Sequence, residues 1–310
     1  MKTLIFSHVS DIDGMGGVVL AKLAFSDVDY VLCETFNLCD KIKEKVDDGS
    51  IYNYDQIFIT DMWVENPDII LNNDFLKNRV LVFDHHESAL DVKNLKDLDF
   101  VNIKIFDDVG RCSGTSLFYS YLKKNGLLAD SLACQEFVEL TRLYDTWEWI
   151  TVKNEPMARD LTTLFNVVGP DAYIKLMVDK LSSNNKNFSF NELENSLIKA
   201  KDEQILKKMQ EYSRRIYFRE VLGLKGGIIF VSYEYRNDLA QYLRDIKIDL
   251  DFVMMVSIDN GTISYRNITP GVNVRVIAEY FGGKGHDYAA SSPIEKDKLD
   301  VIVDILIRKL

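Results

Sequence analysis

Over residues 1–110, short apolar runs alternate with longer stretches of helical patterning. The apolar runs are TLIF (3–6), YVLC (30–33), QIFIT (56–60), RVLVF (79–83) and FVNIKIF (100–106). Stretches with a helical period, such as 14–25 and 39–48, lie between them. Strands that alternate with helices form right-handed βαβ crossovers. The sequence therefore predicts an α/β fold with a mostly parallel five-stranded sheet flanked by helices.

A helical region and a second mixed region follow this sheet. A helix with Ser or Thr near its start and Gly at its end is expected over 113–126, residues 130–182 have helical patterning, and the segment 182–192 is polar. A long charged helix is then expected over about 191–218. Further strands are expected in GGIIFVSY, DFVMMVSI and TISYRN, with helices near 237–246, 271–280 and 295–309.

This pattern predicts two domains, which is also the usual organisation for a chain of 310 residues. We expect one domain over 1–185, a helical connector over 186–220 and a smaller mixed α/β domain over 221–310. A cleft that opens and closes is expected between two domains joined in this way.

Composition excludes several classes of protein. The chain is 47% hydrophobic and 27% charged, and no apolar run approaches the ~20 residues that cross a bilayer. We expect a cytoplasmic protein with no membrane partner, because the apolar stretch near the N-terminus is too short for a signal peptide. The net charge of −11 argues against binding duplex nucleic acid. The four cysteines form no CxxC pair, so a thiolate zinc site is not favoured.

Acids and histidines follow three of the predicted strands at the point where each strand ends. These residues are His8, Asp11, Asp13, Asp61, Asp84, His85 and His86. The carboxyl ends of parallel strands meet at one edge of a sheet, where open α/β folds bind ligands. Asp145, in the later stretch LYDTWEW, is a further acid that can face this edge.

Each of these residues also has a simpler interpretation. Asp11 suits the N-cap of a helix starting near Gly14, Asp61 suits the cap of the next helix, and a single histidine is more often a core or surface residue. Their convergence on one edge favours a metal site, because closely packed carboxylates repel one another unless cations neutralise them. Mixed imidazole and carboxylate donors indicate two ions such as Mn²⁺ or Mg²⁺.

The sequence resembles the DHH phosphoesterase superfamily. The motifs HVSDIDG, TDMW, DHH and YDTWEW occur in that family's order, and FGGKGHDYAAS (281–291) is similar to the glycine-rich motif of the associated DHHA1 domain. The resemblance covers nearly the whole chain. Within the superfamily, GRCSGTSLFY and FVELTRLYDTWEW look most like the oligoribonucleases called nanoRNases.

The resemblance implies a role for each residue at the sheet edge. His8, Asp11 and Asp61 would hold one divalent ion. Asp13, Asp61, His85 and Asp145 would hold the second, with Asp61 bridging. His86 would face the scissile phosphate or help to protonate the leaving oxygen, and Asp84 would orient the histidines. Mn²⁺ is the expected ion, with Mg²⁺ or Co²⁺ as alternatives.

Other residues are candidates for substrate binding. In the C-terminal domain these are Arg266, Gly282, Gly283, Gly285 and His286, around a loop with Lys284 where many relatives have a third glycine. Arg111 precedes an expected helix N-terminus, which is a site that attracts phosphate, although it is equally compatible with a surface cation. The basic residues of the connector, including Lys207, Lys208 and Arg215, favour a solvated helix face over an RNA track.

The expected function is hydrolysis of short single-stranded RNA from the 3′ end to nucleoside 5′-monophosphates by two-metal in-line attack. The alternative within the same superfamily is a phosphodiesterase for signalling nucleotides, namely pGpG, pApA, cyclic AMP or 3′-phosphoadenosine 5′-phosphate. A pyrophosphatase and a non-catalytic nucleotide-binding module are less favoured. Short RNAs or dinucleotides are the expected partners, and the sequence leaves open whether the protein forms a homodimer.

Overall fold

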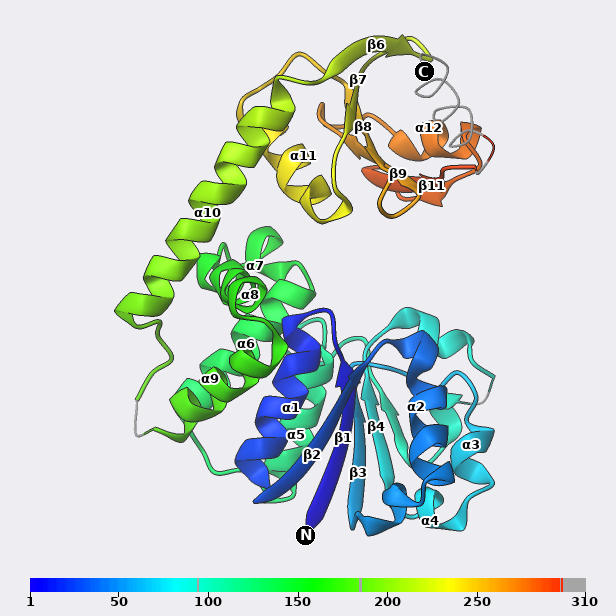
Figure 1. Cartoon of the computed structure of the whole chain (residues 1–310), viewed down its shortest axis with the longest axis vertical. Coiled ribbons are helices and arrows are strands. Elements are labelled where there is room, and N and C mark those ends of the chain that lie inside the picture. Colours follow the sequence, from blue (N-terminus) through cyan, green and yellow to red (C-terminus); the bar gives the residue numbers. More distant parts are fainter. Residues whose placement is uncertain (94, 184–185, 296, 298–310) are drawn as a thin grey trace, which may run out of the picture. The chain divides into compact units, whose positions relative to one another are not determined.

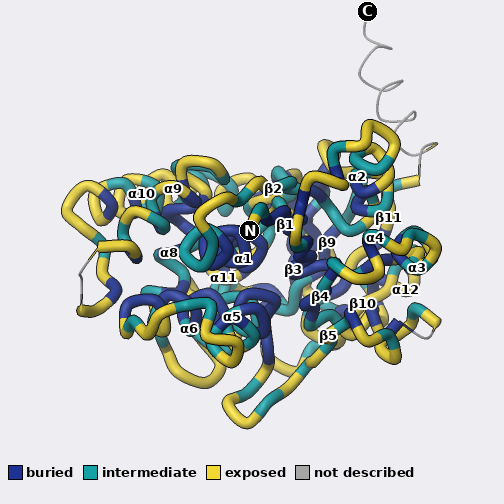
Figure 2. The backbone as a smooth tube through the Cα atoms, turned by 90° about the horizontal axis from the view of Figure 1, so that it is seen from below, coloured by how far each residue is buried: buried dark blue, intermediate teal, exposed yellow. Residues whose placement is uncertain are grey.

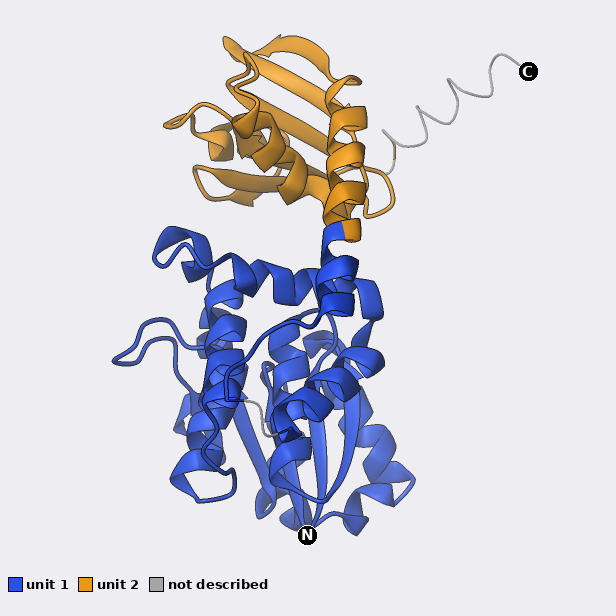
Figure 3. Ribbon diagram, turned by 90° about the vertical axis from the view of Figure 1, so that its left-hand side faces the viewer, with its two compact units in different colours: residues 1–199 blue, residues 200–310 orange. Residues whose placement is uncertain are grey.

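The computed structural model describes residues 1–93, 95–183, 186–295 and 297. The chain divides into two compact units, unit 1 over residues 1–199 and unit 2 over residues 200–310 (Figure 3). The division falls inside one helix, α10 (Glu192–Ser213), which lies within the segment expected to be the connector. No helix among the described residues is long and apolar enough to cross a membrane.

Unit 1 contains a five-stranded sheet in which every pairing is parallel. Its strands are β1 (Lys2–His8), β2 (Asp27–Cys33), β3 (Gln56–Thr60), β4 (Val80–Asp84) and β5 (Val101–Ile103). The strand order is β2-β1-β3-β4-β5. The predicted α/β fold and five-stranded parallel sheet are therefore confirmed.

Helices cover both faces of this sheet. They are α1 (Ile12–Ala24), α2 (Thr35–Asp47), α3 (Asp68–Leu71), α4 (Asp74–Lys77), α5 (Gly114–Lys124), α6 (Leu132–Asp145), α7 (Glu148–Thr151), α8 (Pro156–Val168) and α9 (Pro170–Ser182). Three short 3₁₀ turns, η1 (Ser50–Asn53), η2 (Glu87–Asp91) and η3 (Leu95–Asp97), lie between them. Figure 1 shows α1 and α5 on one side of the sheet and α2 and α3 on the other.

The alternation of side chains along the strands builds two apolar cores. Ile5 and Phe58 belong to the core shared with α1, α5, α6, α8 and α9. Leu4 and Phe6, which point to the opposite face, belong to the core shared with α2, α3 and α4. The three central strands, β1, β3 and β4, are buried on both faces, as is usual in parallel sheets, whereas the edge strands β2 and β5 are partly exposed (Figure 2). This double cover leaves the edge formed by the strand ends as the place where polar groups gather.

Unit 2 contains a mixed six-stranded sheet in the order β10-β11-β9-β8-β7-β6. Its elements are β6 (Tyr217–Val221), β7 (Leu224–Phe230), η4 (Tyr233–Tyr235), α11 (Arg236–Asp245), β8 (Phe252–Ser257), β9 (Thr262–Asn267), α12 (Val274–Tyr280), β10 (Lys284–Gly285) and β11 (Ala289–Pro293). Only β7 and β8 pair in parallel. One core lies under α11 and the end of α10, and another lies under α12.

Several boundaries differ from the sequence predictions. The long charged helix ends at Ser213 and β6 begins at Tyr217, so the last expected connector residues are sheet. The fifth strand of unit 1 is three residues long rather than seven, and Phe106 forms an isolated bridge with Arg111 outside it. Strands β10 and β11 were not predicted, because Ala and Ser in AASSP give no apolar alternation. The helix expected over 295–309 lies outside the described residues.

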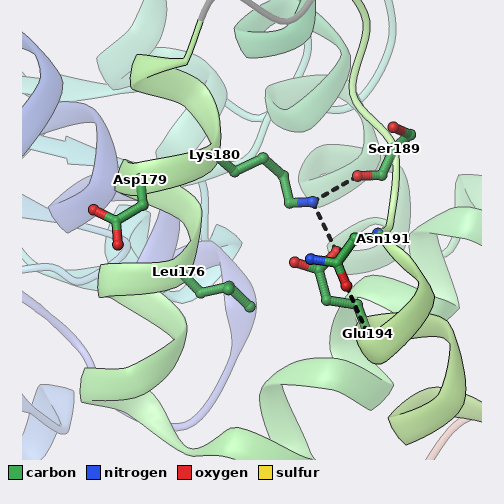
Figure 4. Close-up of a pocket in the computed structure, with 6 residues that line it drawn as sticks. All are labelled: Leu176, Asp179, Lys180, Ser189, Asn191 and Glu194. Atoms are coloured by element: carbon green, nitrogen blue, oxygen red, sulfur yellow. Dashed lines mark hydrogen bonds and ion pairs between the residues drawn. The ribbon is translucent and has the colours of Figure 1, made fainter.

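A buried ion pair fixes the start of α10. Lys180 Nζ lies 2.7 Å from Glu194 Oε2 and donates a second hydrogen bond of 2.6 Å to the carbonyl of Ser189 (Figure 4). The side chains of Lys180 and Glu194 are only 11% and 3% exposed. Glu194 Oε2 also accepts the backbone N–H of Asn191. The pair borders a hollow of about 340 Å³ between α9 and the first turn of α10.

Candidate metal centre

Three neighbouring strands deliver their last residues to one edge of the sheet of unit 1. β1 ends at His8, β3 ends one residue before Asp61, and β4 ends at Asp84. Since β1, β3 and β4 pair in parallel register, the residues that follow them lie close together. The structure thus places the polar residues of all three strand ends at a common edge.

The first group of donors surrounds His8. Its Nδ1 lies 2.8 Å from Asp11 Oδ2 and 3.4 Å from Asp61 Oδ2. Asp11 is also the N-cap of α1, because its Oδ1 accepts the backbone N–H of Gly14. The simpler interpretation of Asp11 as a helix cap is therefore observed, but capping uses only one oxygen and leaves the other facing His8.

Asp61 lies between the two donor groups. Its side chain is 2% exposed and its backbone adopts φ = 59°, in the left-handed region. One of its oxygens faces His8, and the other, Oδ1, lies 3.2 Å from His85 Nε2. The alternative role as a helix cap is wrong, because the next helix, α3, has Pro67 as its N-cap. Asp61 thus contributes one oxygen to each of the two donor groups.

A glycine allows the backbone at Asp61 to approach α5. A Cβ atom on Gly114 would lie 2.7 Å from the backbone N and Cα of Asp61, closer than side chains tolerate. The N–H groups of Gly114 and Thr115 donate to the two oxygens of Asp13, at 2.6 and 3.0 Å. The N-terminus of α5 therefore holds Asp13 as an internal anion.

The second group of donors surrounds His85. Its Nε2 lies 3.2 Å from Asp61 Oδ1, 3.4 Å from Asp145 Oδ2 and 3.7 Å from Asp13 Oδ2. Asp145 reaches this position as the last residue of α6. One imidazole thus faces three carboxylates that come from three separate elements.

His86 is held by a different acid. Its Nδ1 lies 2.8 Å from Asp84 Oδ1, and Asp84 is completely buried at the end of β4. The ring of His86 contacts the ring of Trp63, with centroids 5.4 Å apart. The side chain of His86 is 38% exposed, against 13% for His85. His86 is thus the more exposed of the two histidines, although its ring centroid lies 4.4 Å from that of His85 and it shares a group of candidate metal-ligating atoms with Asp61 and His85.

The electrostatics of the cluster fit divalent cations. Oδ2 of Asp61, of Asp84 and of Asp145 are buried without a hydrogen-bond donor. Burial, together with the charge of Asp13, raises the pKa of Asp61 and Asp145 well above the ordinary range. Burial alone would lower the pKa of His8, but the hydrogen bond to Asp11 and the nearby carboxylate of Asp61 raise the pKa to about 12. Bound protons thus supply the positive charge that a metal ion would otherwise bring to these carboxylate and imidazole side chains.

Glu34 is a site residue that the sequence analysis missed. It directly follows β2, and its Oε2 lies 2.9 Å from His8 Nε2. Its Oε1 accepts the hydroxyl of Ser10. Its position at the end of a fourth predicted strand could have indicated it. A single glutamate before a helix, however, is also typical of an ordinary helix start.

Arg111 lies beside the cluster rather than within it. Its NH2 group is 3.8 Å from Glu87, the residue that follows His86. The expected helix N-terminus does follow Arg111, but Asp13 and the Ser113 hydroxyl accept the first N–H groups of α5. Arg111 therefore offers a side-chain cation at this place, without free backbone donors from the helix.

The substrate-binding candidates of unit 2 lie around strands β9, β10 and β11. Arg266 donates to Asn237 Oδ1, and burial, with the charges of Arg236 and Arg244, lowers its pKa to about 10. His286 is exposed and its ring stacks on Tyr288, with centroids 5.7 Å apart. Arg266, on β9, pairs in register with Ala289 of the neighbouring strand β11.

The glycines of this loop have a structural function in the fold. Gly282 adopts φ = 72° just after α12. A Cβ atom on Gly283 or Gly285 would lie 2.2 or 2.4 Å from the backbone of β11. The glycine-rich segment thus ends a helix and allows β10 to lie close to β11.

No protein-family model matches the chain. A curated relative, the oligoribonuclease NrnB of Bacillus subtilis (strain 168), is 30% identical over 303 residues. The aligned region covers 96% of this chain and 74% of the relative. The chain belongs to the DHH phosphoesterase superfamily. As a member of this family, the protein is an enzyme that hydrolyses phosphodiester bonds.

Solved structures support the same fold. The pGpG-specific phosphodiesterase PggH from Vibrio cholerae matches with a TM-score of 0.54 and 14% identity, covering 100% of this chain and 98% of that one. The exonuclease RecJ bound to manganese matches with a TM-score of 0.53 and 13% identity, covering 98% of this chain and 88% of that one. At such low identity, these two matches are evidence for the fold of this chain and for nothing more.

Proposed function

We propose that this DHH protein hydrolyses short single-stranded oligoribonucleotides from the 3′ end and releases nucleoside 5′-monophosphates. The observation that carries the proposal is Asp61, whose two oxygens face two separate imidazole–carboxylate groups. His8, Asp11 and Asp61 would hold one ion. The second would be held by Asp13, Asp61, His85 and Asp145.

The chemistry follows from this arrangement. Two divalent ions, when bound, supply Lewis acidity and a nucleophilic water at neutral pH. Asp84 holds the Nδ1 side of His86 and, although burial opposes it, raises the pKa of His86. His86 then donates a hydrogen bond from Nε2 to the phosphate and supplies a proton to the leaving 3′ oxygen as the P–O bond breaks.

Unit 2 would hold the terminal nucleotide. The guanidinium groups of Arg236, Arg244 and Arg266 lie close enough for their charges to repel. A phosphate would relieve that repulsion. The stacked pair of His286 and Tyr288 offers an aromatic surface for a base. Support also comes from the curated relative, which is named an oligoribonuclease.

Linear dinucleotides such as pGpG and pApA are the shortest members of this substrate class. The same proposed metal ligands would support their hydrolysis. The proposed ion is Mn²⁺, with Mg²⁺ or Co²⁺ as alternatives, because the donors are imidazoles and carboxylates without a thiolate. The overall charge of −11 also favours short single strands over duplexes.

A ladder of labelled RNAs, from dinucleotides to about 24 nucleotides, tests the proposal in Mn²⁺ with an EDTA control. Cyclic AMP and 3′-phosphoadenosine 5′-phosphate complete the panel. We expect metal-dependent release of 5′-monophosphates that is fastest on the shortest RNAs, and its loss when Asp84 and His85 are both changed to Ala. Equal rates on long and short RNAs, or activity only on cyclic AMP or 3′-phosphoadenosine 5′-phosphate, would contradict the substrate assignment.

A further inference from the structure

A short hairpin stands beside the metal centre, after β5. Phe106 and Arg111 form an antiparallel bridge, and the N–H of Asp107 donates to the carbonyl of Gly110. Phe106 is 56% exposed, and the side chain of Arg111 is 48% exposed. The guanidinium of Arg111 lies over the ring of Phe106, 4.9 Å from its centroid. An aromatic ring and a cation thus form one exposed unit.

This hairpin is attached to both sides of the metal centre. Arg111 NH2 lies 3.8 Å from Glu87, which follows His86 in the chain. The backbone N–H of Arg111 donates to Glu148 Oε1, and Glu148 lies three residues after Asp145. Arg111 therefore contacts the residue that follows a proposed catalytic histidine and a residue three positions after a proposed metal ligand.

A buried arginine holds the backbone of this exposed arginine. Arg142 NH1 donates to the carbonyl of Arg111 at 2.9 Å and contacts Glu148 Oε2 at 2.5 Å. The other side of the Arg142 guanidinium binds both oxygens of Glu139, at 2.8 and 2.9 Å. The Arg142 side chain is only 4% exposed. Both polar backbone atoms of Arg111 are thus bound by one buried charge network.

The local backbone is shaped to accept this network. Gly110 adopts φ = 153°, and a Cβ atom there would lie 3.0 Å from Glu148 Oε2 and 3.3 Å from Arg142 NH1. Trp147 adopts the left-handed φ of 62°, at the turn between α6 and α7. A surface hairpin needs no buried arginine to close its turn, so this network fixes the position of the exposed Phe106–Arg111 pair.

We propose that Phe106 and Arg111 form a platform for one nucleotide of a single-stranded substrate, and that Arg142 and Glu148 are positioning residues for it. An aromatic ring and a planar guanidinium both stack on bases, and the guanidinium also binds phosphate. This inference rests on the proposed function, because it names a further binding site for the same class of substrate.

Steady-state hydrolysis of pApA in Mn²⁺ tests the platform with four variants: Phe106→Ala, Arg111→Ala, Arg142→Lys and the Arg111→Ala/Arg142→Lys double variant. Stacking on one base predicts a rise in KM of about tenfold with kcat within about twofold for each single variant. Arg142→Lys keeps the charge but not the forked geometry. If Arg142 acts through Arg111, the double variant has the KM of Arg111→Ala alone.

Tyr52→Ala is the matched control, because Tyr52 is a comparably exposed aromatic residue that precedes β3, at the opposite edge of the sheet. It should keep the KM of the wild type. Dinucleotides with an abasic sugar at either position add a second readout. For one of the two, wild type and Phe106→Ala should have the same KM, because the base served by the platform is missing.

Wild-type KM values for Phe106→Ala and Arg111→Ala would overturn the platform. Additive effects in the double variant would overturn the positioning role of Arg142. If the wild type hydrolyses none of these substrates, the proposed function fails, and binding of a fluorescent dinucleotide then decides the platform separately. In that case, unchanged binding by Phe106→Ala overturns the platform and weaker binding supports it.

Discussion

His8 Nε2 lies 2.9 Å from Glu34 Oε2, while Nδ1 of the same ring faces Asp11 and Asp61. In the neutral ring, a proton on Nε2 that is donated to Glu34 would leave Nδ1 available to hold the proposed ion. Carboxylates that orient a metal-binding histidine raise metal affinity by about 10–100-fold. We therefore expect Glu34→Gln to weaken Mn²⁺ binding by about tenfold, measured by calorimetric titration.

Glu44→Gln provides the control for this prediction. Glu44 is a more exposed glutamate of α2 that pairs only with Lys41 among the described residues. Its substitution should leave Mn²⁺ binding unchanged. Equal affinity in wild type and Glu34→Gln would show that Glu34 does not support His8.

The stability of the metal-free protein should fall as the pH rises from 6 to 8. Although burial opposes the change in the histidines, neighbouring carboxylates raise the pKa of His8, His85 and His86. Burial raises the pKa of Asp61 and Asp145. Groups with a raised pKa hold more protons in the folded state than in the unfolded state, so their contribution is lost as the pH increases.

Mn²⁺ replaces these protons, so the increase in Tm that it causes should be larger at pH 8 than at pH 6. Thermal unfolding of the EDTA-treated protein, with and without Mn²⁺, measures this difference. An increase in Tm that is the same at both pH values would contradict the assignment of the ion to this cluster.

Lys180→Met should destabilise unit 1, because it leaves the buried carboxylate of Glu194 without its cation. The loss of one partner from a buried pair predicts a fall of about 3 kcal/mol in the free energy of unfolding. Lys175→Met is the control on the same helix, because Lys175 and Asp179 are 79% and 63% exposed. That change should have little effect. Denaturant unfolding measures both variants, and an equal free energy of unfolding for the two would contradict the prediction.

Gly114→Ala should damage the metal centre without abolishing folding. The new Cβ would lie 2.7 Å from the backbone of Asp61 and displace the bridging carboxylate. A displacement of this kind predicts a loss of about 100-fold in hydrolysis. Gly126→Ala, just beyond the other end of α5, meets nothing within 4 Å; its φ of 68° costs some stability, but the variant should keep its activity. Wild-type turnover by Gly114→Ala would show that Asp61 tolerates the shift.

The parallel sheet and its polar edge could be predicted because both follow from local patterns. The strand predicted over 56–60 coincides with β3, and the acids and histidines follow the strands that the apolar runs indicate. The carboxyl ends of parallel strands then bring His8, Asp61 and His85 together without any knowledge of side-chain positions.

The remaining features depend on contacts between distant parts of the chain. Asp13 accepts the amides of α5 from about a hundred residues away, and no local pattern indicates that the helix N-terminus is occupied. Strand β11 forms because β9 offers a partner, since its own Ala and Ser residues have little preference for strands. The binding of Arg111 by Arg142 and Glu148 likewise appears only when α6, α7 and the hairpin are packed.

The most direct test of the account is the initial rate of pApA hydrolysis as Mn²⁺ is added to EDTA-stripped, dialysed protein. Two ions bridged by Asp61 predict a rate that stays low through the first equivalent of bound Mn²⁺ and reaches its plateau at the second. The same titration of Asp61→Asn should remain flat. Full activity in the metal-free protein, or a plateau at one equivalent, would contradict the two-metal site.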